Sequence, residues 1–219
     1  MEIVSSGCAL PRPSSASARN VHATVLRFAA CMAFASLAGC ASVPTSGSLL
    51  AGMGARGQAK TIAQLDLKAA TVLPLGQEGL DAAFDGSSDV LHLTGYDSYY
   101  RIFRIDPSEG QRKVVVRAYC RCLGFDKRMM VPVLRFLDDR GLPVEAIDTR
   151  YSLVQAESFT PMSLKLRVFV PAGNVRYVVV VADNSQPDST VQGINVDGVL
   201  HLDIRSYPLG KFNVTYQAL

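Results

Sequence analysis

A period-two alternation of apolar and polar residues is the feature that most restricts the fold of this 219-residue chain. The longest such run is Lys113–Leu123. Its alternate positions are small and apolar: Val114, Val116, Ala118, Cys120 and Cys122. Because successive side chains of a strand point to opposite faces, the run predicts a half-buried strand with Arg117 and Arg121 on its outer face.

Other segments have the composition of short strands. They are Tyr99–Ile105, Val131–Leu137, Leu164–Phe169, Arg176–Ala182, Val199–Arg205 and Phe212–Tyr216. Arg176–Ala182 is apolar at successive positions, which indicates a central strand that is covered on both faces. Turn residues separate several of the strands, as at Asp138–Gly141, and no long amphipathic helix interrupts them. We therefore predict a mainly β fold, an antiparallel β-sandwich.

The predicted sandwich begins with a short helical segment. Thr61–Ala69 (TIAQLDLKA) contains good helix formers, with Thr61 as a candidate N-cap. Ile62, Leu65 and Ala69 share one face of such a helix. Residues 61–219 are long enough for one domain with a single core.

The N-terminal part of the chain has the pattern of an export signal. An apolar run, Phe28–Ala38, is too short to span a membrane as a helix and follows the basic residues Arg19 and Arg27. It closes with Leu37-Ala38-Gly39-Cys40, which resembles the lipobox of bacterial lipoprotein precursors. The resemblance implies that residues 1–39 are a lipoprotein signal peptide and that Cys40 carries the lipid.

The residues after Cys40 indicate a location. In lipoproteins of this kind an acidic residue after the cysteine favours retention in the inner membrane, whereas this chain has Ala41 and Ser42. The resemblance therefore implies a lipid anchor in the outer membrane, on its periplasmic face. Residues 40–60 are rich in Gly, Ala and Ser, and we expect a lipidated N-terminus followed by a flexible tether.

The charge of the chain does not indicate a partner. The sequence has 22 Lys and Arg against 19 Asp and Glu, and residues 1–39 contain three of these Arg and one Glu. The remainder is nearly balanced and has no basic run along the sequence. Nucleic acid is therefore not an expected ligand.

Two cysteines of the remaining chain are close in sequence, at Cys120 and Cys122. On one face of an extended strand, residues two apart have Cα atoms about 6.5 Å apart, near the upper limit for a disulfide. The pattern favours buried core thiols. A local disulfide formed at a bulge, or a redox or metal-binding pair, are the alternatives.

Candidate catalytic and metal-binding residues are few. The sequence has no Gly-x-Ser-x-Gly motif, and His92 and His201 each alternate with leucines, as on the polar face of a strand. The segment 183–197 is rich in oxygen-bearing side chains but does not match a calcium-binding loop, so we interpret it as solvated, with a calcium or saccharide contact as the alternative. We expect no enzyme activity, cofactor or metal.

Aromatic residues are the remaining candidates for ligand binding. Tyr96, Tyr99 and Tyr100 lie together in GYDSYYRIF. Sugars often dock on aromatic faces, but tyrosines near strand starts also pack with a solvated hydroxyl. Both interpretations stay open, and packing is the favoured one.

Several stretches together resemble one family. They are TIAQLDL, YYRIFRIDPSEGQRKVVVRAY, VPVLRFLDDRGLPVEA, TRYSLVQ, LKLRVFVPAGNVRYVVVVAD and DGVLHLDIRS. Their order is similar to that of MalM, the maltose operon periplasmic protein family. The resemblance implies a periplasmic β-rich protein associated with uptake of maltose or maltodextrins, and no catalytic residues. The lipobox and the Cys120–Cys122 pair depart from the family's enteric members.

These observations lead to two expectations about function. The first is a non-catalytic outer-membrane lipoprotein that assists carbohydrate uptake, with maltodextrin and an outer-membrane porin as candidate partners. The second is an envelope adaptor that binds another protein through a sheet edge and has no sugar ligand. Exposure of the three tyrosines beside a concavity would favour the first.

Overall fold

The strand pattern in the sequence produces three sheets. The computed structural model describes residues 60–107, 110–122, 126–156, 161–171, 174–196 and 200–219, all within one compact unit, Pro44–Leu219. The predicted signal peptide and Cys40, and the predicted tether apart from Lys60, lie outside the described residues. Among the described residues, no helix is long and apolar enough to cross a membrane.

The first sheet has the order β1-β4-β11-β7-β8, with β3 paired to β4 outside this path. Its strands are β1 (Thr71–Val72), β3 (Val90–Leu93), β4 (Tyr96–Arg104), β7 (Pro132–Asp138), β8 (Pro143–Val144) and β11 (Val175–Ala182). Neighbours are antiparallel except β1 and β4, which are parallel.

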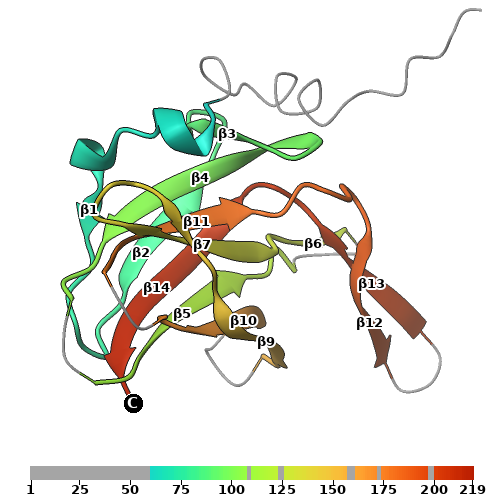
Figure 1. The fold of residues 1–219 in the computed structure, drawn as a ribbon. Helices are drawn as coiled ribbons and strands as arrows, with labels where there is room; N and C mark the ends of the chain where they lie inside the picture. The colour runs from blue at the N-terminus through green and yellow to red at the C-terminus, as the bar shows by residue number, and fades with distance from the viewer. Residues whose placement is uncertain (1–59, 108–109, 123–125, 157–160, 172–173, 197–199) are drawn as a thin grey trace, which may run out of the picture. The chain divides into compact units, whose positions relative to one another are not determined.

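The second sheet is fully antiparallel, in the order β2-β14-β5-β10-β9. Its strands are β2 (Leu80–Phe84), β5 (Arg112–Tyr119), β9 (Ile147–Val154), β10 (Ser163–Phe169) and β14 (Gly210–Ala218). A small third sheet contains β6 (Lys127–Met129), β12 (Thr190–Val196) and β13 (Leu200–Ser206). Figure 1 shows β12 and β13 as a hairpin at the right.

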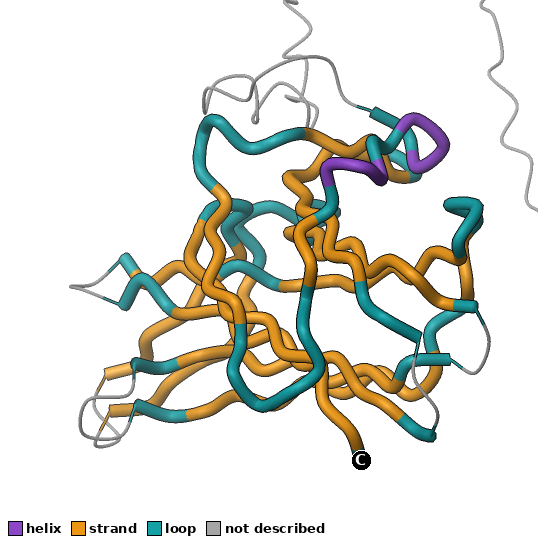
Figure 2. The backbone as a smooth tube through the Cα atoms, turned by 90° about the vertical axis from the view of Figure 1, so that its left-hand side faces the viewer, coloured by secondary structure: helices purple, strands orange, loops and turns teal. Residues whose placement is uncertain are grey.

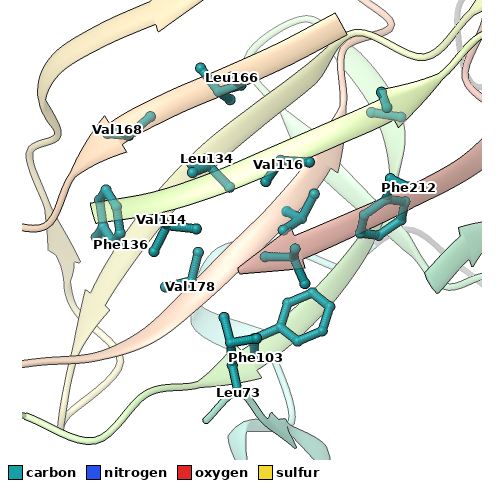
Figure 3. Close-up of a cluster of buried hydrophobic side chains, with 14 of the residues drawn as sticks. Leu73, Phe103, Val114, Val116, Leu134, Phe136, Leu166, Val168, Val178 and Phe212 are labelled. Atoms are coloured by element: carbon teal, nitrogen blue, oxygen red, sulfur yellow. The ribbon is translucent and has the colours of Figure 1, made fainter. Parts of the chain in front are cut away.

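The first two sheets bury a shared apolar core. Val178 and Phe136 of the first sheet and Val116 and Leu166 of the second are all fully buried in one cluster. Figure 3 shows these side chains directed into the space between strands of the two sheets. The predicted antiparallel β-sandwich is therefore confirmed.

The central strand β11 is buried on both faces, as its apolar run predicts. Val178 and Val180 point into the sandwich core, whereas Val179 and Val181 belong to a second buried cluster on the other face of the first sheet. That second cluster is covered by half-buried leucine and isoleucine side chains of the N-terminal segment, Ile62, Leu65 and Leu67.

The N-terminal segment forms two 3-10 helices in place of the single helix predicted, η1 (Ile62–Gln64) and η2 (Leu67–Ala69), drawn in purple in Figure 2. Thr61 precedes the first, and its backbone N–H donates to Gln64 Oε1 at 2.9 Å. Asp66 interrupts the helix because its carboxylate accepts from the Lys68 N–H at 3.1 Å, which begins the second turn. Leu67 packs against the sheet together with Ile62 and Leu65, whereas the predicted third residue of this face, Ala69, does not.

The predicted turn at Asp138–Gly141 is confirmed and links β7 to β8. The Asp138 carboxylate accepts from the backbone N–H groups of Arg140 and Leu142, at 2.9 and 2.8 Å. Gly141 has φ +80°, a conformation that side-chain-bearing residues rarely adopt, and a Cβ there would lie 2.9 Å from Leu67 Cδ1.

Some strands differ from the prediction in their boundaries, their existence or their partners. The strand predicted over Lys113–Leu123 ends at Tyr119, and β2 forms in a segment whose alternation is too weak to reveal it. The strand predicted over Val199–Arg205 forms as β13 but pairs in the third sheet, where the side chain of Ile204 is buried. Which sheet a strand joins depends on contacts with residues far away in the sequence, and the segment alone does not determine them.

We expect Leu166→Ala to lower the free energy of unfolding by about 2–5 kcal/mol, because Leu166 is 0% exposed and truncation leaves a cavity between the sheets. Urea denaturation followed by circular dichroism measures this loss. Leu142→Ala is the matched control, because Leu142 is 57% exposed and its truncation should change stability by less than about 0.5 kcal/mol. Equal effects of the two substitutions would contradict the core assignment.

Candidate functional site

The three candidate tyrosines do not form one exposed platform. Tyr99 and Tyr100 are 0% and 4% exposed and point to opposite faces of β4, as successive strand residues must. Tyr99 stacks beside Phe84 in the sandwich core, with ring centroids 6.4 Å apart. Tyr100 and the half-buried Tyr96 pack in the second cluster instead. The sugar platform that the sequence left open is therefore wrong, and packing is the role observed.

Burial also alters the acidity of these hydroxyl groups. Desolvation raises the pKa of Tyr100 to about 12, with smaller contributions from Asp89 and Asp66. Burial, followed by the nearby Asp183 carboxylate, raises the pKa of Tyr96 above its ordinary value. Both hydroxyl groups are therefore neutral at physiological pH.

Cys120 and Cys122 form a disulfide, so the favoured prediction of buried core thiols is wrong and the local disulfide is correct. The reason is that β5 ends at Tyr119, before both cysteines. Outside the extended strand the two Cα atoms lie 5.2 Å apart, within the usual range for a disulfide. Both residues are half-buried.

The disulfide borders a polar hollow of about 540 Å³. On its wall, the guanidinium of Arg128 lies 4.8 Å from the ring centre of Tyr207 and forms an ion pair with Asp126 at 2.9 Å. Arg121 is exposed beside it. The Arg128 guanidinium therefore already has two partners within the protein, Asp126 and Tyr207, and its role here is structural.

The predicted position on the polar face of a strand can be checked for one of the two candidate histidines. His92 lies on the exposed face of β3, and its Nδ1 is 2.6 Å from Asp97 Oδ1 across the hairpin to β4. The side chain of His201 lies outside the described residues. Among the described residues, no group of three or more His, Cys, Asp or Glu side chains is arranged to hold a metal ion.

The described part of the predicted solvated segment 183–197 has a structural role. Asn184 is 1% exposed, and its Nδ2 donates to the backbone carbonyl of Asp97 at 3.0 Å. The Asp183 carboxylate accepts from the Ser185 N–H at 2.9 Å. From Thr190 the chain continues as β12, so only the first half of this segment is a loop.

One end of the sandwich contains a cleft of about 460 Å³, which we call the end cleft. It is lined mainly by apolar residues from the ends of strands, including Ile147, Phe169 and Val175. Arg112 and Asp148 add charged groups, and Asp148 has φ +50°, a strained conformation at the start of β9. A volume of this size falls in the range of roughly 300–1,000 Å³ that suits small ligands.

The strand β9 is an open edge of the second sheet. It pairs with β10 on one side, and no other described strand pairs with its second side. Six of its eight residues are exposed. Tyr151 is 46% exposed, and its hydroxyl donates to the Pro132 carbonyl at 2.9 Å, which ties this edge to the first sheet. An open edge presents unpaired backbone donors and acceptors to another chain.

No known family model, curated protein sequence or solved structure matches this chain. The similarity to the MalM family therefore stays a prediction from the sequence.

Proposed function

We propose that this chain is a lipid-anchored, non-catalytic adaptor on the periplasmic face of the bacterial outer membrane, where it holds a partner protein through the open edge of β9. The edge strand is the observation that carries the proposal, because the extended backbone of β9 after Asp148 can accept a partner's strand by adding it to the sheet. The local Cys120–Cys122 disulfide supports an oxidising compartment such as the periplasm.

In this proposal the lipid holds the protein at the membrane surface. Cys40 carries the acyl chains, and each buried methylene contributes about 0.8 kcal/mol to membrane binding. In this proposal the predicted tether, residues 40–60, lets the sandwich sample the space near the membrane. Restricting the adaptor to this layer raises its effective concentration near an outer-membrane porin or another envelope protein.

Accessory function in carbohydrate uptake is the second candidate, and the end cleft is the observation that favours it. The cleft combines the half-buried aromatic ring of Phe169 with the polar groups of Gln111 and Arg112. An aromatic face flanked by hydrogen-bonding groups suits a sugar ring. The resemblance to the MalM family points to maltodextrin as the ligand to test.

We expect Cys40→Ala to move the protein from the membrane fraction to the soluble periplasmic fraction, because the substitution removes the acylated thiol. Fractionation followed by immunoblotting measures the change. Cys31→Ala, in the predicted signal peptide, is the matched control and should leave the protein in the membrane. Retention of the Cys40 variant in the membrane would refute lipid anchoring at this residue.

We expect a photo-crosslinking residue at Ser152, on exposed β9, to form a discrete adduct with an envelope protein in intact cells, because the partner strand lies along this edge. The same residue at Asp81, on β2 at the opposite edge of the sheet, is the control and should not form that adduct. Denaturing electrophoresis and mass spectrometry identify the products. The edge proposal fails if Ser152 forms no adduct, or if both positions give the same one.

If the second candidate is correct, calorimetric titration of the full chain in detergent with a maltodextrin mixture should give saturable heat. Phe169→Ala should weaken this binding about tenfold or more, because it removes the aromatic face of the end cleft. Tyr96→Ala, which truncates a half-buried aromatic residue outside the cleft, is the control. Absence of heat with the unaltered chain would remove the carbohydrate candidate and leave the adaptor.

A further inference from the structure

The outer face of the second sheet gathers basic residues that are dispersed in the sequence. On β5 and β10 the residues between the core-facing positions are mostly charged. Four cationic side chains on this side, which we call the basic face, are Lys113, Arg117, Lys165 and Arg167. The sequence contains no basic run along the chain. Pairing of β5 with β10 creates the basic face.

Like charges lie directly opposite one another on this face. Lys165 pairs in register with Arg117 of β5, and Arg167 pairs with Arg150 of β9. Arg150 has an acidic partner, since its Nη2 lies 2.7 Å from Asp148 Oδ2. Among the described residues, no carboxylate forms an ion pair with Lys165 or Arg117. Directly opposed like charges destabilise a sheet unless an anion lies between them.

The environment of Lys165 reflects this repulsion. Burial lowers the pKa of its ammonium group, and the neighbouring cations Arg167, Arg117 and Lys113 lower it further. The nearest acid in the same cross-strand row is Asp81, and its carboxylate accepts a hydrogen bond from Asn213 Nδ2 at 2.8 Å. The protein therefore leaves the positive charge at Lys165 and Arg117 uncompensated.

A small cavity of about 170 Å³ lies at this position. Its lining residues are Gln77, Val115, Arg117, Lys165, Asn213, Thr215 and Gln217. Thr215 is only 8% exposed, and its Oγ1 is buried with no hydrogen-bond partner among the described residues. Arg167 lies opposite Val115, one of the lining residues. Its Nε is also buried and has no hydrogen-bond partner among the described residues. Buried donors of this kind are expected to meet an acceptor.

The segment before β2 forms part of the rim of this cavity. A Cβ at Gly79 would lie 2.6 Å from Thr215 Cγ2 and would also overlap the Asn213 side chain. Only glycine therefore lets the backbone approach so closely. The close approach helps to bury Thr215 while the cavity beside it stays open.

We propose that this cavity binds a phosphate group, either as free phosphate or as part of a phosphodiester headgroup. Arg117 supplies a guanidinium fork, Lys165 an ammonium and Thr215 a hydroxyl. Several donors from different directions match a tetrahedral oxyanion better than a planar carboxylate, which has two acceptor oxygens. The volume lies below the roughly 300 Å³ of small-molecule pockets, so it suits one functional group and not a whole sugar. The site is separate from β9's free edge and from the end cleft.

Titration of the purified full chain by calorimetry, in detergent and in a phosphate-free buffer of about 0.15 M ionic strength, tests this proposal. Inorganic phosphate is the probe for the free ion, and glycerophosphoglycerol is the soluble probe for a diester headgroup. We expect saturable binding of at least one probe at a single site, and the tighter probe identifies the source. Lys165→Gln and Arg117→Gln should each weaken it about tenfold or more.

The control is Lys211→Gln, which removes an exposed cation from the same face of β14 but outside the cavity. It should leave the affinity within about twofold, because exposed charges at a distance are screened. Thermal unfolding without phosphate provides a second measurement. Lys165→Gln should unfold at the same or a higher temperature than the parent, because it relieves like-charge repulsion. The proposal is overturned if neither probe binds saturably, or if Lys165→Gln and Lys211→Gln have the same effect on binding.

Discussion

The rest of the structure depends on burial of β11 on both of its faces. Four consecutive valines, Val178–Val181, are each 0% exposed, and they alternate between the sandwich core and the cluster on the opposite side. At roughly 1.5–3 kcal/mol for each fully buried side chain, this strand contributes strongly to both clusters. The second cluster requires a cover, which explains why the N-terminal segment places Ile62, Leu65 and Leu67 against the sheet.

The two large sheets differ in how much of their surface is buried by packing against other parts of the protein. The first sheet packs apolar side chains on both sides, so it offers little surface for recognition. The second sheet directs its main apolar core to one side, with Val114, Val116 and Ala118 inward. Its outer side and its edge strand β9 are free to hold charged groups and open backbone. Features suited to interaction therefore gather on the second sheet, and the proposed functions use them.

The side chains that the sequence offered as candidates for ligand binding, redox chemistry or catalysis stabilise the fold instead. Tyr99 fills the core, Cys120 and Cys122 close a short loop after β5, and His92 contacts Asp97 across a hairpin. Each of these groups has its contacts within the protein. The adaptor role that we propose therefore relies on the surfaces of the sandwich and not on these side chains.

Much of the fold was predictable because alternation is a local property. The strands β5, β10 and β11 and the turn at Asp138–Gly141 follow from neighbouring residues and their steric preferences. The predicted N-terminal helix failed because the Asp66 side chain competes for backbone donors, a local effect that average helix propensity does not capture.

The sequence by itself determined the mainly β character, the doubly buried central strand and the lipobox-like motif that ends at Cys40, because each is contained in continuous segments. Only the tertiary structure decided that β13 leaves the sandwich, that the Tyr96, Tyr99 and Tyr100 side chains separate, and that Lys165 faces Arg117. These outcomes depend on which strands become neighbours and in what register. Register is set by the packing of all strands together, since a strand satisfies its backbone hydrogen bonds only with partners that lie far away in the sequence.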